Sequence, residues 1–298
     1  LANNHTMDFG DEGLSATISA FKKARVMGAG SWNEAYQMNS FTTKDGLTIG
    51  VISCTHCEFG TLTDKQHAIE NGERGCGRSL STEIVRNIIG SKECDFLIVF
   101  QHGGIEYMDQ PLPEWREIFK HWIDMGADAV IASHPHVPQG WEYYKGKPIC
   151  YSLGNFCFNQ LNPKKEAPAH WYDSLCCTLD IEKSHECKMT IRPLWYDYKN
   201  GYICDNEREG FKQHLAHLNE TLNNEKAYDE YVNKFCKNLY PSYMGQFSRS
   251  GWVANLFSKG FLKGIAEGVL GRGLFNKVHA LNNLQCESHR WAILRGMK

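Results

Sequence analysis

Hydrophobic residues along the chain form short runs, separated by amphipathic stretches, in an order that predicts alternating strands and helices. Apolar runs occur at 47–54, 94–101 and 127–132, and their length and composition predict buried strands. Between them, the stretches 81–89 and 112–126 carry apolar residues at helical spacing, and another helix is expected at 11–25. This alternation predicts an α/β fold.

The pattern changes after Gly140. The stretches 141–144, 148–152, 174–181 and 187–194 read as short strands joined by turns, which predicts an antiparallel section. From about 207 the chain is expected to be helical to its end. The sequence therefore predicts two domains, an α/β domain over 1–204 and a helical region over 205–298.

The segment 252–284 combines basic residues with glycines at every fourth position, namely Gly260, Gly264 and Gly268. These glycines share one helical face and permit close approach of backbones. The spacing favours helix packing within the protein or in a homodimer. Peripheral binding at a membrane interface is the alternative, because basic amphipathic segments bind there.

Composition excludes some functions. The 298 residues are 42% hydrophobic and 22% charged with a net charge of −2, which argues against a nucleic-acid partner. No apolar run approaches the roughly 20 residues of a membrane-spanning helix. Twelve cysteines without paired spacing predict mostly free thiols in a reducing compartment. Free thiols predict a cytoplasmic location. Because the chain begins at Leu1 without Met, it is expected to be truncated, and a membrane-associated location is the alternative that an anchor before Leu1 would give.

Histidines recur where the predicted strands end. His102, His134 and His136 follow apolar runs, and His5 is expected to follow a strand whose body lies before Leu1. The carboxyl ends of such strands lie at one rim of an α/β fold. On an extended chain, His134 and His136 would point the same way. Asn4 adds a carbonyl oxygen, so this set suits a divalent transition metal. Each histidine alone has the alternative reading of a hydrogen-bonded loop residue.

Further polar residues accompany this set. Asp8 stands three residues after His5, where it can hold one ring nitrogen and orient the other. Cys54 and Cys57 form a CxxC that has no partner CxxC, and they are interpreted as loop cysteines after a strand.

Taken together, these motifs resemble bacterial CapA-type capsule-synthesis proteins, the poly-γ-glutamate family built on the calcineurin-like metallophosphoesterase fold. The resemblance covers about residues 1–200. It rests on Asn3-Asn4-His5 with Asp8-Phe9-Gly10, Gly28-Ala29-Gly30, His102-Gly103-Gly104 with Glu106-Tyr107, Ser133-His134-Pro135-His136 and Tyr151-Ser152-Leu153-Gly154-Asn155-Phe156.

The resemblance implies a four-layer α/β/β/α sandwich with a metal site. By the family pattern, Asn4, His102 and His134 bind one metal, and His136 binds a second. In the same pattern, His5 is the catalytic histidine, assisted by Asp8, and Glu106 and Tyr107 contact substrate. Glu106 has the alternative reading of a solvated loop charge. Ser133 stands where the family pattern has glycine. The family's first strand and its carboxylate ligands would lie before Leu1, so two divalent ions (Mn, Zn or Fe) are expected only in a complete protein.

Three functions are compatible with these observations. The leading hypothesis is a metal-dependent hydrolase that serves capsule or poly-γ-glutamate synthesis, with the polymer as its partner. The second is a non-enzymatic polymer-handling or scaffold subunit on the same fold. The third is a phosphoesterase that acts on a small phosphorylated or nucleotide substrate.

Overall fold

A computed structural model describes residues 1–58, 61, 74–91, 93–158, 166–184, 186–245 and 282–298. The chain divides into two compact units, Leu1–Tyr228 and Asp229–Lys298, and each is described by itself. Helix α5 (Glu209–Asn223) thus belongs to the first unit. The domain boundary at 204 stays a prediction.

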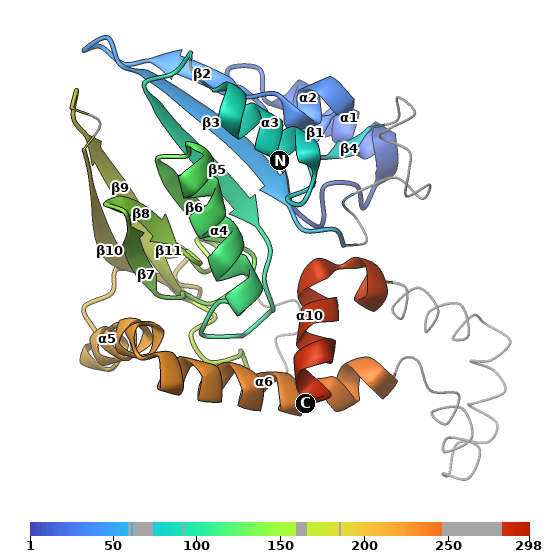
Figure 1. The fold of residues 1–298 in the computed structure, drawn as a ribbon, viewed down its shortest axis with the longest axis vertical. Helices are drawn as coiled ribbons and strands as arrows, with labels where there is room; N and C mark the ends of the chain where they lie inside the picture. The colour runs from blue at the N-terminus through green and yellow to red at the C-terminus, as the bar shows by residue number, and fades with distance from the viewer. Residues whose placement is uncertain (59–60, 62–73, 92, 159–165, 185, 246–281) are drawn as a thin grey trace, which may run out of the picture. The chain divides into compact units, whose positions relative to one another are not determined.

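The first unit is built on a six-stranded mixed sheet (Figure 1). Its strands, in spatial order, are β2 (Asn39–Thr42), β3 (Thr48–Thr55), β5 (Phe96–His102), β6 (Ala129–Ser133), β8 (Lys147–Cys150) and β7 (Trp141–Tyr144). Strands β3, β5, β6 and β8 run parallel, and β2 and β7 are antiparallel edge strands. The α/β class predicted from the sequence is confirmed.

Two smaller sheets accompany it. One is fully antiparallel and contains β9 (Asp173–Ile181), β10 (Cys187–Asp197) and β11 (Tyr202–Asp205). The other pairs β1 (Ala29–Gly30) with β4 (Gly75–Cys76). The antiparallel section expected after Gly140 is therefore correct for β9–β11. It is also correct for the β7–β8 hairpin, but β8 pairs in addition in parallel with β6, because an apolar strand gains more burial inside the large sheet than in a separate hairpin.

The other elements that the structure describes are helices. They are α1 (Gly10–Ala20), α2 (Trp32–Tyr36), α3 (Thr82–Gly90), α4 (Pro113–Met125), α6 (Glu225–Gly245) and α10 (Glu287–Gly296). Helix α4 buries Trp115, Phe119 and Trp122, the stripe expected at helical spacing. Its end is set by Gly126, whose φ of 128° suits a residue without a Cβ.

Alternation along the central strands explains the layers. Leu97 and Val99 of β5 are almost completely buried, on the face toward α3 and α4, whereas Ile98 lies on the opposite face. On that second face, Ile98 and Ile131 pack with Leu175 and Met189 of the antiparallel sheet, and α5 closes this core with Phe211, Leu215 and Leu218. Three layers, α/β/β, are thus present among the described residues, and the outer helical layer of the expected four-layer α/β/β/α sandwich stays a prediction. The outer face of the small sheet carries exposed polar residues such as Thr178 and Arg192.

The second unit is helical in its described parts. Gly296 of α10 lies so close to Cys236 and Tyr240 of α6 that a Cβ there would clash with both. The ring of His289 also contacts that of Tyr243. The segment 252–284, predicted to pack against a helix or a membrane, lies almost wholly outside the described residues. Within the parts that the structure describes, no helix is long and apolar enough to cross a membrane.

Candidate metal centre

The candidate site lies where three parallel strands end side by side. In the register of the large sheet, Thr55 of β3 is opposite His102 of β5, and His102 is opposite Ser133 of β6. The backbone N–H of His56 donates to the carbonyl of His102 at 2.9 Å, which extends the pairing by one residue beyond β3. The residues that follow these strands are therefore brought to one rim of the sheet, as the α/β pattern predicts.

Three of the predicted residues converge at this rim. His102 Nε2 lies 3.1 Å from Asn4 Oδ1 and 3.3 Å from His134 Nδ1. Asn4 and His134 are buried. Two atoms bound at about 2.05 Å to a tetrahedral metal would be about 3.3 Å apart. The separations of His102 Nε2 from the other two donors are thus those expected between ligands of a single ion.

His102 is oriented from its other ring nitrogen. The Ser133 hydroxyl lies 3.2 Å from His102 Nδ1, which leaves Nε2 directed at Asn4 and His134. Ser133 is the position where the sequence departs from the glycine of the resembled motif. The serine hydroxyl therefore provides the kind of outer contact that fixes the ring of a metal-binding histidine.

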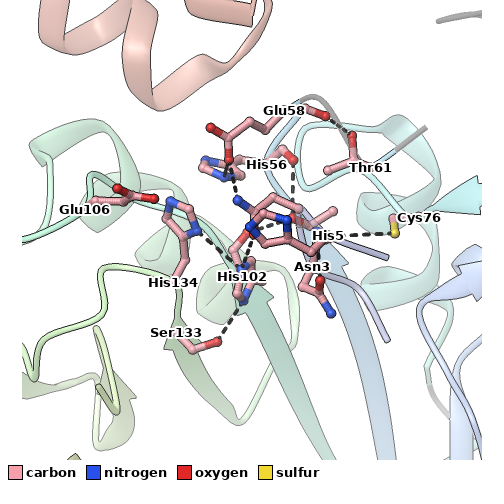
Figure 2. A network of polar contacts seen from close by, with 12 residues as sticks. Asn3, His5, His56, Glu58, Thr61, Cys76, His102, Glu106, Ser133 and His134 are labelled. Carbon is pink, nitrogen blue, oxygen red and sulfur yellow. Dashed lines mark hydrogen bonds and ion pairs between the residues drawn. The ribbon is translucent and has the colours of Figure 1, made fainter. Parts of the chain in front are cut away.

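The sequence analysis did not identify two residues of this rim, His56 and Glu58. Figure 2 shows both pointing toward His102 and His134. Glu58 Oε2 accepts a hydrogen bond from Asn4 Nδ2 at 2.8 Å and lies 3.3 Å from His56 Nε2. His56, Glu58 and His134 form a group with ligand atoms within 4.8 Å of one another, a geometry able to hold a metal ion. The signal was available, since His56 directly follows β3 just as His102 ends β5.

The electrostatics of the rim favour the neutral form of His102. Desolvation by the surrounding protein is the main cause that lowers the pKa of His102 to about 3, and positive charge on His56, His136 and His5 would lower it further. Glu58 acts in the opposite direction. A neutral imidazole has a nitrogen lone pair for a cation, so His102 is held in the form that can bind a metal.

His5 forms the contact expected with Asp8. Its Nδ1 lies 2.7 Å from Asp8 Oδ2, and the side chain is 59% exposed. The carboxylate can hold Nδ1 protonated and leave Nε2 to exchange a proton with a substrate. The turn that presents His5 is fixed locally, because Asn3 Oδ1 accepts from the His5 backbone N–H at 2.9 Å.

His134 and His136 are not extended, and this corrects the expectation that they point the same way. Their φ angles are 110° and 62°, and their rings are inclined by 46° with centroids 6.0 Å apart. Tertiary contacts override the local preference for an extended residue before Pro135. The carbonyl of Ser133 accepts from Gly103 N–H, and that of Pro135 accepts from Tyr107 N–H. Such positive φ values in non-glycine residues are typical of functional sites.

Asn155 determines which nitrogen of His136 carries the proton. Its Nδ2 donates to two backbone carbonyls, those of His136 at 3.2 Å and Trp171 at 3.1 Å. Its Oδ1 must then accept, so His136 Nδ1, at 2.8 Å, is the donor. His136 Nε2 therefore has the lone pair, and it lies 4.0 Å from Glu106 Oε1.

Glu106 and Tyr107, the predicted substrate contacts, are both exposed beside His136. The Tyr107 ring stacks on His136 with centroids 6.2 Å apart, and Trp171 stacks on the same imidazole at 5.1 Å. An imidazole packed against two aromatic rings has little freedom to rotate. His136 is thus placed next to His134 but directed toward a different side of the rim.

The donor set fits a divalent first-row metal. Asn4 offers an amide oxygen, Glu58 a carboxylate, and His56, His102 and His134 imidazole nitrogens. Mixed nitrogen and oxygen donors suit zinc, iron and manganese.

All twelve cysteines are free thiols, as predicted.

Comparison with known proteins agrees with the predicted family. The family model for the bacterial capsule synthesis protein PGA_cap matches residues 1–160, more than half of the chain. The chain belongs to the PGA_cap family. The resemblance given by the Asn4, His102 and His134 motifs is therefore confirmed at the level of the family.

Curated relatives carry related names. The "PGA biosynthesis protein CapA" of Bacillus subtilis is 34% identical over 53% of this chain and 42% of its own length. The "Capsule biosynthesis protein CapA" of Bacillus anthracis is 32% identical over 54% of this chain and 39% of its own. The matches thus span about two-fifths of these PGA_cap relatives. Among solved structures, a calcineurin-like phosphoesterase, YfkN of B. subtilis, aligns with 72% of this chain and 70% of its own at 15% identity and a TM-score of 0.35.

Proposed function

We propose that this PGA_cap chain acts in capsule or poly-γ-glutamate synthesis as a metal-dependent hydrolase. The observation that carries the proposal is the convergence of Asn4, His102 and His134 at the ends of parallel strands, with separations suited to one ion. The exposed His5–Asp8 pair adds a group able to transfer protons. Its partner would be the capsule polymer or a phosphorylated small molecule. A nucleic-acid partner is not expected.

Each group has a distinct role in the proposed reaction. Asn4, His102 and His134 would hold a divalent cation, which supplies positive charge to stabilise the oxyanion that develops during hydrolysis. His5 donates a proton from Nε2 to the leaving group, and Asp8 stabilises the charged imidazole at Nδ1. His136 presents a lone pair at Nε2 beside Glu106, where it can bind a second ion or accept a proton.

The exposed Glu106 and Tyr107 support contact with substrate. They lie at the open side of His136 and add a carboxylate, a phenol and an aromatic face. A carboxylate there would repel an uncompensated polyanion. A cation bound at the site would reduce this repulsion, which is consistent with the proposed dependence on metal.

The test is hydrolysis by the purified chain with Mn²⁺, Zn²⁺ or Fe²⁺, compared with the same protein after chelation. The chain length of poly-γ-glutamate and the release of the phenol from an aryl phosphodiester are measured in parallel. Metal-dependent shortening of the polymer supports the proposal. Cleavage of the phosphodiester alone would favour a phosphoesterase with a small substrate. Metal binding without either reaction would contradict the hydrolase and favour the scaffold function.

A further inference from the structure

We propose that His56 and Glu58, which follow β3, are ligands of the same metal ion as Asn4, His102 and His134. The inference deepens the proposed function and rests on it. Glu58 would supply this centre with a carboxylate from the segment that follows β3. The centre then has three imidazole nitrogens and two oxygens.

The first argument is the position of both residues. The His56 backbone is tied to His102, since its N–H donates to the His102 carbonyl and the Thr55 hydroxyl donates to the same oxygen at 2.9 Å. The side chains of His56 and His134 are also in contact, with ring centroids 4.4 Å apart. His56 is therefore held against the rim by its own strand.

The second argument is the spacing of the donor atoms. Glu58 Oε2 lies 3.3 Å from His56 Nε2, which equals the separation between His102 Nε2 and His134 Nδ1. Asn4 links the two pairs, because its Oδ1 faces His102 and its Nδ2 donates to Glu58. His56, Glu58 and His134 each offer a ligand atom, and these three atoms lie within 4.8 Å of one another.

The third argument is charge and burial. His56 has no exposed surface, and the Glu58 side chain is 8% exposed. Imidazoles and a carboxylate removed from water carry a desolvation cost, which a divalent cation offsets by binding all of them. A site that combines three imidazoles with a carboxylate and an amide oxygen is suited to Mn²⁺, Fe²⁺ or Zn²⁺.

A competing explanation is that Glu58 only orients Asn4 through their hydrogen bond. The two explanations differ in magnitude, because loss of an outer contact costs about 10–100-fold in metal affinity. They also differ in the ligand count, since His56 contributes a coordinated nitrogen only in the proposed centre.

The experiment is Mn²⁺ titration of the 298-residue chain, followed by electron paramagnetic resonance of the unbound ion. Glu58→Gln and His56→Gln are compared with the matched surface variants Glu83→Gln and His121→Gln. We expect one Mn²⁺ per chain, a Kd raised more than about 100-fold by each site variant, and no change in the controls. Circular dichroism without metal checks that each variant is folded.

A second measurement needs no variant. Electron spin echo modulation from imidazole ¹⁴N in the Mn²⁺-loaded wild-type chain should count three coordinated histidines, and two in His56→Gln. A count of two in the wild type, or site variants that lose less than about 100-fold, would overturn the inference and leave the hydrolase proposal standing. Absence of Mn²⁺ and Zn²⁺ binding by the wild type would refute both.

Discussion

Replacing Asn155 by leucine tests the assignment of the His136 tautomer. Asn155 is buried and makes three hydrogen bonds, with His136 Nδ1 at 2.8 Å, the His136 carbonyl at 3.2 Å and the Trp171 carbonyl at 3.1 Å. Leucine has a similar size but no polar group. The two carbonyls and the imidazole N–H would lose their partner in a largely dry environment.

The magnitude follows from these contacts. A net contribution of about 1 kcal/mol for each hydrogen bond predicts a loss of about 3 kcal/mol in the free energy of unfolding, measured by urea denaturation. Asn155→Asp is the matched variant. It loses the two donated hydrogen bonds but keeps an oxygen that accepts from His136 Nδ1, so it should also be less stable while retaining the tautomer.

The tautomer is read by long-range ¹H–¹⁵N correlation of the imidazoles, with His136 assigned by its disappearance in His136→Gln. We expect Nδ1–H in the wild type and in Asn155→Asp, and a mixture of tautomers in Asn155→Leu. A stability loss below about 1 kcal/mol in Asn155→Leu, or an unchanged tautomer there, would show that Asn155 does not position His136.

Three further outcomes are expected. Tyr151→Phe removes the hydroxyl that donates to Glu142 at 2.5 Å and should lower the free energy of unfolding, measured by urea denaturation, by about 1.5–3 kcal/mol. The control Tyr144→Phe should leave the urea midpoint unchanged, and equal effects of the two variants would contradict a role for the Tyr151–Glu142 pair. His5→Ala should lower any metal-dependent turnover by about 10²–10⁴-fold with the metal content intact, and parallel loss of metal would instead make His5 a ligand. Burial is the main cause that lowers the pKa of His214 to about 4, from about 6.5 in the unfolded chain. The unfolded chain therefore binds a proton before the folded one as pH falls from 6.5 to 4, and about 1–2 kcal/mol of the free energy of unfolding should be lost over that range. His214→Leu should flatten this pH dependence.

The elements of the fold were predictable because their signals are local. Buried parallel strands show as continuous apolar runs, and the observed β3, β5 and β6 begin and end within two residues of the runs that predict them. The stripe of α4 is equally visible, since Trp115, Phe119 and Trp122 recur at helical spacing. Convergence of His102 and His134 could also be predicted, because parallel strands end at one rim whatever their order in the sheet.

What only the tertiary structure decided depends on contacts between distant segments. The turn at His134 and His136 adopts positive φ angles because loop and strand backbones pair there, and no local rule predicts that. Glu58 joins Asn4 across 54 residues of sequence, and the glycine-to-serine change at Ser133 acquires meaning only through His102 Nδ1. A single sequence shows the chemical type of each side chain and its place on an element. The direction in which a buried side chain points is set by packing around it, and for this site that direction decides which donors meet.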